Sequence, residues 1–352
     1  MNGSQGENQP HMTAQPSTTA TTPTPRPDAA LEGRITALLP RLKSAREGIE
    51  SVIIGQPHVV ADCMTAILAG GHFLLVGLPG LGKTKLVETL GTVLGLDEKR
   101  VQCTPDLMPA DILGSEILVT GADGQRHFTF VEGPVFTQLL MADEINRASP
   151  RTQSALLQAM QEYAVTVSGT ARHLPKPFHV MATQNPLEQE GTYPLPEAQL
   201  DRFMLQIDIT YPSRDEERRM VMLTTGATPP KAAKVLSSAD IIEAQDIVRR
   251  LPIGDSVVDA ILALVAEGRP EQSRIDLVKK YVSWAPGPRA AQALMLAVRA
   301  RALLNGRYAP SVDDVIALAP AVLKHRMALN FAARSAGVNV HDVITRMVDN
   351  IN

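Results

Sequence analysis

The feature that most constrains this chain is a glycine-rich turn at Gly77–Thr84, with the sequence GLPGLGKT. It follows a short apolar run, His72–Val76, and precedes a segment with helical periodicity, Lys83–Leu94. This order of strand, loop and helix is the context in which the pattern G-x-x-x-x-G-K-[ST] binds nucleotide phosphates. Glycines let backbone N–H groups curve around phosphate oxygens, and the helix N-terminus adds a favourable dipole. The pattern predicts a phosphate-binding loop, and a plain tight turn is the alternative.

Two side chains of the loop have expected roles in binding ATP and Mg²⁺, the predicted cofactors. Lys83 would place its charge on the β- and γ-phosphates, and Thr84 would offer its hydroxyl to the metal. The other nucleotide-binding residues expected here are Gly77, Pro79, Gly80, Leu81, Gly82 and Lys85.

A second apolar run, Leu139–Ala142, ends in the acidic pair Asp143 and Glu144. Ligands of doubly wound sheets bind beyond the carboxyl ends of the strands, so these carboxylates point to the same site. Asp143 would hold the metal, directly or through water, and Glu144 would act as general base on the attacking water. Alone, such a pair is more often a solvated turn, but the upstream phosphate loop favours the catalytic interpretation.

A third polar signal is Asn185, which follows the apolar run Phe178–Thr183. Its side chain could orient water toward the γ-phosphate, and Thr183 or Gln184 could take that role in a shifted register. An asparagine after a strand is also a common turn former, so this signal depends on the other two.

The order of segments predicts an α/β fold with a parallel, doubly wound sheet, because short strands alternate with helices. The expected strands are His72–Val76, Val101–Cys103, Leu139–Ala142, Phe178–Thr183 and Phe203–Thr210. Beyond Tyr211 the strand signals stop and only helices are expected, at Ile241–Arg250, Ser256–Ala266, Asp276–Tyr281, Ala290–Leu304, Val312–Leu329 and Asp342–Asn350. We therefore predict a disordered tail at 1–28, a nucleotide-binding domain at 29–212, a linker at 213–235 and an all-helical lid domain at 236–352.

Composition excludes several classes of function. Aromatic residues make up only 4 % and the net charge is −3, so nucleic acid binding is not expected. No apolar stretch is long enough to span a membrane, and no secretory signal is present, so we expect a cytoplasmic protein. The basic triplet Lys324–Arg326 is expected to lie on a solvated helix face.

Longer runs give the chain a family resemblance. Asp143–Glu162, Ala182–Phe203 and Cys103–Gly114, followed by Gly133–Phe136, resemble the MoxR AAA+ ATPases. The resemblance extends over about residues 31–350. It implies a P-loop AAA+ core followed by a helical lid, with ATP at the junction of the two domains.

The resemblance also implies roles for single residues. Gln56 looks like part of the adenine pocket, and Asn185 looks like sensor 1. Arg202 resembles the arginine finger that reaches the neighbouring subunit's nucleotide, and Arg289 resembles sensor 2 on the lid. The family pattern before that arginine more often reads Gly-Ala-Ser-Pro, whereas this chain has Ala-Pro-Gly-Pro at 285–288.

An always-charged, planar guanidinium suits the transition state of phosphoryl transfer, because charge spreads over the γ-phosphate oxygens. The alternative for Arg202 is a salt bridge to Asp201 or Glu197. The alternative for Arg289 is an ordinary arginine at a helix start.

Two insertions are expected to form hairpins. The stretch from Pro105 to about Gly133 resembles the helix-2 insert of this clade, with a turn at Gly121–Gly124. Residues 164–172 alternate and turn at Ser168-Gly169. In related rings such hairpins project toward the pore or substrate, and a stabilising surface hairpin is the alternative.

The resemblance implies a chaperone-like ATPase that acts as a homo-oligomer, as a hexameric ring. It would remodel or mature a client protein, with a separate von Willebrand factor A domain protein as a possible partner. One alternative is the ATPase subunit of a magnesium chelatase, and another is a nucleotide-gated scaffold with little turnover. A DNA-remodelling function has little support from the composition.

Overall fold

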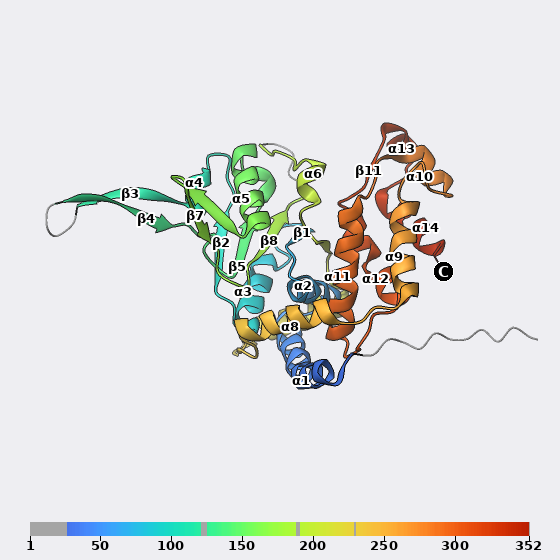
Figure 1. Ribbon diagram of the computed structural model, residues 1–352, viewed down its shortest axis with the longest axis horizontal. Helices are drawn as coiled ribbons and strands as arrows, with labels where there is room; N and C mark the ends of the chain where they lie inside the picture. Colours follow the sequence, from blue (N-terminus) through green and yellow to red (C-terminus); the bar gives the residue numbers. More distant parts are fainter. Residues whose placement is uncertain (1–26, 121–124, 188–190, 229, 352) are drawn as a thin grey trace, which may run out of the picture.

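A five-stranded parallel sheet forms the centre of the computed structural model, which describes residues 27–120, 125–187, 191–228 and 230–351 (Figure 1). Its strands lie in the order β2-β5-β8-β1-β9. Their bounds are β1 Phe73–Gly77, β2 Glu98–Gln102, β5 Leu139–Asp143, β8 His179–Gln184 and β9 Leu205–Ile209. Every pairing within this sheet is parallel, which confirms the predicted α/β class.

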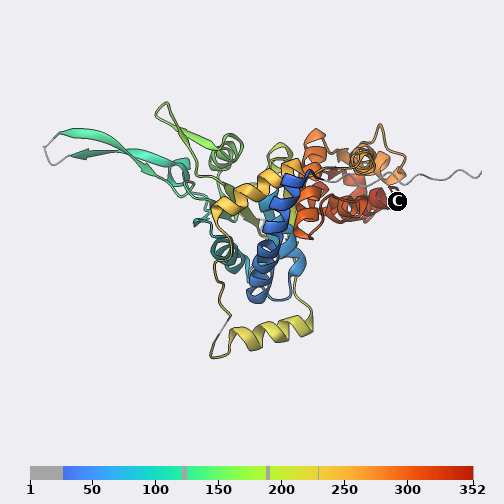
Figure 2. The ribbon, with the colours of Figure 1, turned by 60° about the horizontal axis from the view of Figure 1, so that its bottom comes forward.

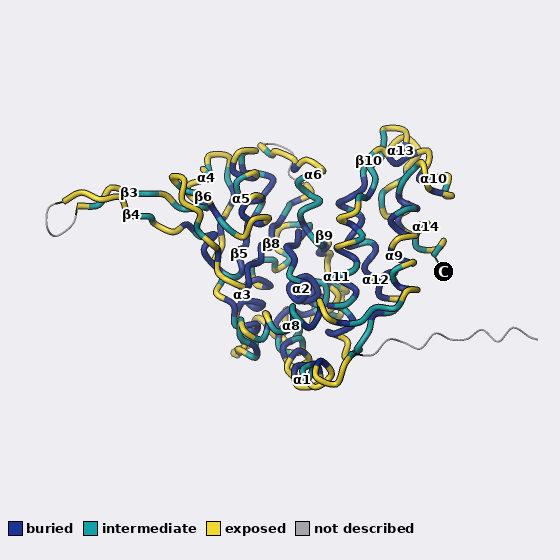
Figure 3. Tube along the Cα trace, viewed as in Figure 1, coloured by how far each residue is buried: buried dark blue, intermediate teal, exposed yellow. Residues whose placement is uncertain are grey.

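Alternate residues of the strands point to two apolar layers. Phe73 and Leu75 pack toward α1 (Ala29–Val52), α2 (Pro57–Leu68) and α3 (Lys83–Leu94), whereas Leu74 packs toward α5 (Pro150–Glu162) and the short α4 (Pro109–Leu113). Burial on both faces explains why these strands read as continuous apolar runs. Figure 3 shows the inner strands β5 and β8 as almost entirely buried. The edge strand β2 begins at Glu98, earlier than the predicted start at Val101. The apolar pattern did not reveal its first residues because they are polar and partly exposed.

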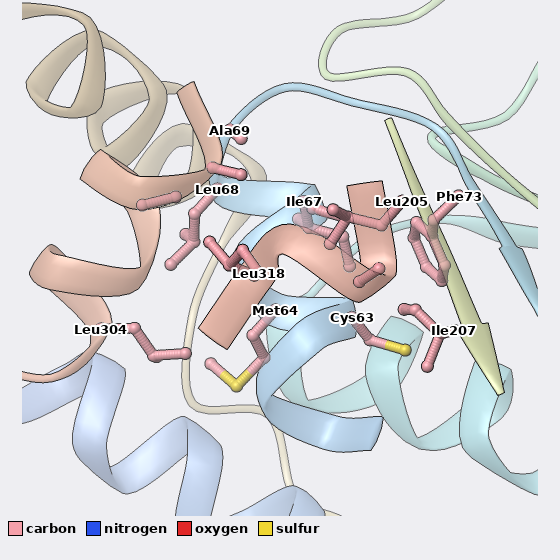
Figure 4. Packing of buried hydrophobic residues seen from close by; sticks show 14 of the residues in the cluster. Cys63, Met64, Ile67, Leu68, Ala69, Phe73, Leu205, Ile207, Leu304 and Leu318 are labelled. Carbon is pink, nitrogen blue, oxygen red and sulfur yellow. The ribbon is translucent and has the colours of Figure 1, made fainter. Parts of the chain in front are cut away.

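The C-terminal region is mainly helical and packs directly on the α/β domain. Its helices are α8 Ser238–Arg250, α9 Asp255–Glu267, α10 Asp276–Tyr281, α11 Pro288–Leu304, α12 Val312–Leu323, α13 Phe331–Ser335 and α14 Val340–Asp349. Helix α11 packs against α2, and one apolar cluster continues through both domains. Figure 4 shows Met64 and Leu68 of α2 with Leu304 of α11 and Leu318 of α12.

Two predictions for this region were wrong. The region is not all-helical, because β10 (Val282–Trp284) and β11 (Ala328–Leu329) form an antiparallel pair. The helix expected over Val312–Leu329 ends at Leu323, since the chain then turns to bind the α/β domain and enters β11.

The predicted linker at 213–235 contains a helix, α7 (Arg214–Thr224). The helix starts at a capping box in which Ser213 and Glu216 satisfy each other's backbone N–H groups. All of its residues are described and none is buried. In Figure 2 it is the olive-yellow helix that stands apart from the body at the bottom.

Both predicted hairpins are present. β3 (Gly114–Thr120) and β4 (Arg126–Glu132) pair antiparallel and project far from the body (Figure 1), although their predicted turn at 121–124 lies outside the described residues. β6 (Ala164–Val167) and β7 (Thr170–His173) turn at Ser168 and Gly169, both with positive φ.

The remaining short elements and the chain start complete the fold. A 3₁₀ turn, Ile145–Arg147, follows β5, and α6 spans Glu197–Leu200. The predicted tail, 1–28, lies outside the described residues except for its last two, of which Asp28 caps α1. Within the described ranges, no helix combines the length and apolar character needed to cross a bilayer.

Candidate nucleotide site

Three of the predicted site segments meet at one edge of the sheet. The phosphate loop follows β1, Asn185 follows β8, and Asp143 ends β5, and β8 lies between the other two strands. Because the strands are parallel, their carboxyl ends share one edge. The topology therefore brings together side chains that are far apart in the sequence.

The phosphate loop has the backbone conformation that its glycines predict. Gly80 and Gly82 adopt φ of 83° and 78°, a left-handed region that side chains disfavour. Helix α3 starts at Lys83, so its free N–H groups point into the loop. The Lys83 ammonium donates to the Gly77 carbonyl at 2.7 Å, across the mouth of the loop.

One buried hydroxyl contacts both acidic residues, Asp143 through its side chain and Glu144 through its backbone. Thr183 Oγ1 donates to Asp143 Oδ1 at 2.6 Å and accepts from the Glu144 backbone N–H at 2.9 Å. Glu144 itself has φ of 56°, a left-handed conformation that is unusual for a non-glycine residue. The threonine that the sequence offered as an alternative sensor thus fixes the geometry of the acidic pair.

Three polar partners of the acidic pair were missed by the sequence analysis. Arg100 Nη2 donates to Asp143 Oδ2 at 2.6 Å. Gln102 and Arg147 both donate to Glu144 Oε2, at 2.8 and 2.9 Å. Arg100 and Gln102 lie two residues apart on β2 and so share one face of that strand, which pairs with β5. Two polar residues at this spacing on an edge strand were the sequence signal that could have identified them.

The acidic pair also affects a neighbouring thiol. Burial and, to a smaller extent, the charges of Asp143 and Glu144 together raise the pKa of Cys103 to about 12. The thiol therefore stays protonated beside the site, as expected for a buried reduced cysteine.

Asn185 lies at the same edge and is 5 % exposed. Its Oδ1 accepts a hydrogen bond from the Leu187 backbone N–H at 3.2 Å. The side-chain oxygen is therefore fixed by the local turn.

A pocket of about 290 Å³ lies beside the phosphate loop. Gln56 lines it together with Gly80, Leu81, Gly82 and Lys85, five of the predicted nucleotide-binding residues. The opposite wall comes from Tyr211, Pro212 and α7, and the lining residues within the described ranges end at Thr224. The nucleotide is expected at the junction with the 236–352 lid, but the residues of the described ranges that line this pocket all come from outside that region.

The two predicted arginines lie together in another pocket, also of about 290 Å³. Arg202 and Arg289 line it with His72 and Tyr163, and Arg289 Nη1 lies 3.7 Å from Asp201 Oδ2. Neither arginine lines the pocket beside the phosphate loop. Arg202 precedes the amino end of β9, whereas Gly77 pairs with Ile209 at the carboxyl end of that strand.

The loop and its neighbours fit a triphosphate with a divalent cation. The left-handed glycines form a cradle in which an added Cβ would meet no atom within 4 Å, so backbone N–H groups stay accessible. The hydroxyl of Thr84 and the carboxylate of Asp143 are the oxygen ligands that Mg²⁺ prefers. The donor set therefore matches a Mg²⁺-nucleotide.

The parallel sheet, the phosphate loop and the acidic pair together define a P-loop nucleoside triphosphatase. Residues 72–205 match the family model of the "ATPase family associated with various cellular activities (AAA)", and residues 275–347 match the AAA lid domain.

Individual relatives narrow the class. The chain is 40 % identical to "Chaperone MoxR1" of Mycobacterium tuberculosis, over 92 % of this chain and 85 % of that protein. It is 30 % identical to "Protein MoxR" of Methylorubrum extorquens, over 80 % and 85 % of the two chains. The crystal structure of an inferred ATPase from Cytophaga hutchinsonii superposes with a TM-score of 0.84 at 35 % identity, covering 92 % and 98 %. The chain belongs to the MoxR family of AAA ATPases, which confirms the resemblance noted in its sequence.

Proposed function

We propose that this protein hydrolyses ATP to ADP and phosphate with Mg²⁺, in a ring whose neighbouring subunits complete each site. The observation that carries the proposal is the convergence of the phosphate loop, the acidic pair and Asn185 at one edge of the sheet. Membership of an ATPase family supports the same chemistry.

Each residue at this edge has a distinct task in the proposed reaction. Lys83 and the loop N–H groups bind the β- and γ-phosphates, and Thr84 with Asp143 holds the cation. When bound, Mg²⁺ supplies positive charge that offsets the charge on the phosphate oxygens. Glu144 takes a proton from the attacking water, and Asn185 orients that water. Lys85 and Gln56 border the nucleotide.

The position of the two arginines supports assembly. The five residues of β9 separate Arg202 from the phosphate-loop edge, about 16 Å at 3.3 Å per residue. Arg202 and Arg289 therefore cannot be expected to reach the nucleotide of their own chain. If the arginine pocket of one subunit faces the phosphate loop of the next, the contact is head-to-tail, the type of interface that forms a ring when the rotation between subunits closes. We propose that this ring is a hexamer.

The proposal that the protein acts on a client is supported by a relative named a chaperone and by the exposed β3–β4 hairpin. A relative at 40 % identity is named a chaperone, which supports ATP-driven remodelling or maturation of a partner protein. The β3–β4 hairpin exposes Phe128 at 70 % and Leu118 at 52 %, so it is a candidate contact for a client. A partner with a von Willebrand factor A domain and a cytoplasmic location are parts of the same proposal.

Phosphate release by purified wild type and by Glu144→Gln tests the proposal. We expect Glu144→Gln to bind ATP as tightly as wild type and to release phosphate about 10²–10⁴-fold more slowly, the usual contribution of a general base. Lys83→Ala should lose ATP binding. Glu47→Gln, on the exposed face of α1, is the matched control. Equal phosphate release by wild type and Glu144→Gln would contradict the proposal and leave a nucleotide-gated scaffold.

The Glu144→Gln variant, which is expected to bind ATP without hydrolysing it, also tests whether the protein binds a client. Affinity capture with Glu144→Gln in ATP should retain a partner that wild type releases. A well-formed ring that retains nothing would contradict remodelling while leaving hydrolysis intact.

A further inference from the structure

The basic triplet Lys324–Arg326 does not lie on a solvated helix face, as its sequence suggested. His325 and Arg326 are 3 % and 2 % exposed, and all three side chains contact β9 or the turn before it. Lys324 Nζ lies 2.6 Å from Asp208 Oδ2, and His325 Nε2 bonds the Phe203 carbonyl at 2.9 Å. The triplet therefore ties the end of α12 to the central sheet.

Arg326 makes the densest set of these contacts. Its Nε donates to Asp201 Oδ1 at 2.8 Å, and its Nη2 donates to the carbonyls of Asp201 and Phe203 at 3.3 and 2.6 Å. Its Nη1 donates to the carbonyls of Met204 and Val322 at 3.0 and 2.6 Å. A buried cation is tolerated only when its donors are satisfied, and here the guanidinium fork holds the backbone on both sides of Arg202.

Asp201 extends this contact to the second arginine. One carboxylate oxygen accepts from Arg326, and the other lies 3.7 Å from Arg289 Nη1. Arg326, Arg289 and Arg202 all line the same pocket. In the described part of the chain, Arg202 Nε is buried without a hydrogen-bond partner. The direction of the Arg202 side chain therefore depends on the backbone that Arg326 holds.

We propose that Arg326 is a positioning residue for Arg202 and Arg289, the two arginines that would act on the neighbouring subunit's nucleotide. This inference rests on the proposed function. Since Arg326 lies just beyond the end of α12 at Leu323, it makes the direction of both arginines depend on where the C-terminal helices sit against β9. A shift of those helices would then change hydrolysis in the next subunit.

The first test is Arg326→Lys. A lysine ammonium keeps the charge but cannot bond one carboxylate and carbonyls on several residues at once. We expect kcat for phosphate release to fall about 10- to 100-fold, as for a misplacement of about 1 Å in a catalytic group. The Kd for a fluorescent ATP analogue should stay within about twofold, because the arginines lie outside their own subunit's nucleotide pocket.

Arg307→Lys is the matched control. Arg307 lies between α11 and α12 and pairs with a carboxylate, Asp314, at 2.7 Å, but it has no hydrogen bond to residues 201–204 in the described part of the chain. Its kcat should stay within about twofold of wild type. An equal loss in both variants would mean that Arg326 only stabilises the fold.

A mixing experiment separates positioning from general damage. Arg326→Lys subunits keep an intact phosphate loop, whereas Lys83→Ala subunits keep intact arginines. Mixed before assembly in equal amounts, they should regain about a quarter of wild-type activity, since about one interface in four combines both intact halves. A mixture no more active than its separate components would overturn the inference.

Two further variants keep the outcomes distinct. If Arg326→Lys does not fold, Asp201→Asn carries the test, since it removes the charge that binds Arg326 and Arg289 at nearly constant shape. It should lose kcat and regain activity in the same mixture, and wild-type kcat would overturn the inference. Arg202→Ala tests the proposed function itself: unchanged kcat there would contradict the arginine assignment. An inactive Arg202→Ala beside a fully active Arg326→Lys would refute only the positioning role.

Discussion

The hydroxyl group of Thr183 contacts both acidic residues of the site, and its removal has a predictable cost in stability and activity. Thr183 is fully buried, donates to Asp143 Oδ1 at 2.6 Å and accepts from the Glu144 backbone N–H at 2.9 Å. Thr183→Val replaces the hydroxyl by a methyl group at almost the same shape. Both hydrogen bonds are lost, and neither partner gains a new one from the valine.

The magnitude follows from these two bonds. A hydrogen bond to a charged group contributes about 1.5–3 kcal/mol net, and the orphaned amide adds about 1 kcal/mol. The new buried methyl returns about 0.8 kcal/mol. We therefore expect the free energy of unfolding to fall by about 2–3 kcal/mol. Because Asp143 and Glu144 lose their common anchor, kcat should fall about tenfold or more.

Urea unfolding followed by circular dichroism, with phosphate release in parallel, measures both effects. Thr183→Ser is the control, since it keeps the hydroxyl and loses only a methyl group, at about 1 kcal/mol. Its kcat should stay within about twofold of wild type. If Thr183→Val matched Thr183→Ser in both stability and kcat, the hydroxyl would not anchor the acidic pair.

Three further predictions concern other parts of the molecule. Gly55 has φ of 78°, and an added Cβ would lie 2.9 Å from Glu216 Cβ at the start of α7, so Gly55→Ala should cost about 1–3 kcal/mol and raise the KM for ATP. The control Gly33→Ala, inside α1 where an added Cβ meets no atom within 4 Å, should leave KM unchanged and raise the free energy of unfolding by about 1 kcal/mol. Urea unfolding measures the stability of both variants, and steady-state kinetics measures their KM. Burial lowers the pKa of His179 from 6.5 to about 4, so unfolding takes up a proton below pH 6.5, and the free energy of unfolding should drop by about 2 kcal/mol for this residue between pH 7 and 5. His179→Gln should show a smaller drop in urea unfolding, and an unchanged drop would refute the assignment. Asp314 is 2 % exposed and pairs with Arg301 and Arg307, so Asp314→Asn should lower the free energy of unfolding by about 3 kcal/mol, and a change below about 0.5 kcal/mol would contradict that role.

The parts of the fold that the sequence predicted correctly are those encoded by neighbouring residues. The order of strand, glycine loop and helix at 73–94 is local, and so is the apolar run that ends at Asp143. Parallel pairing then follows from the alternation of strands and helices, which brings both segments to one edge without further information.

The parts that were missed depend on tertiary contacts. Arg100 meets Asp143 only because β2 pairs with β5 across a long insertion. The triplet Lys324–Arg326 looks solvated in the sequence, and only its partners on β9 make it buried. Helix α7 shows no helical pattern of apolar residues in the sequence because none of its residues is buried. Strands β10 and β11, with three and two residues, are too short to show the alternation of apolar and polar residues that identifies a strand.

The continuous apolar cluster between α2, α11 and α12 has a mechanical consequence. Pulling the C-terminal helices off as a rigid body would expose side chains such as Met64, Leu304 and Leu318, at about 1.5–3 kcal/mol each. Such a joint is stiff, whereas α7 and the outer β3–β4 hairpin, which bury little, move at small energetic cost. Hydrogen exchange should therefore be slow along α2 and α11 and fast along α7. In the proposed remodelling function, a force on a client would be transmitted through this stiff joint, while α7 and the β3–β4 hairpin would move.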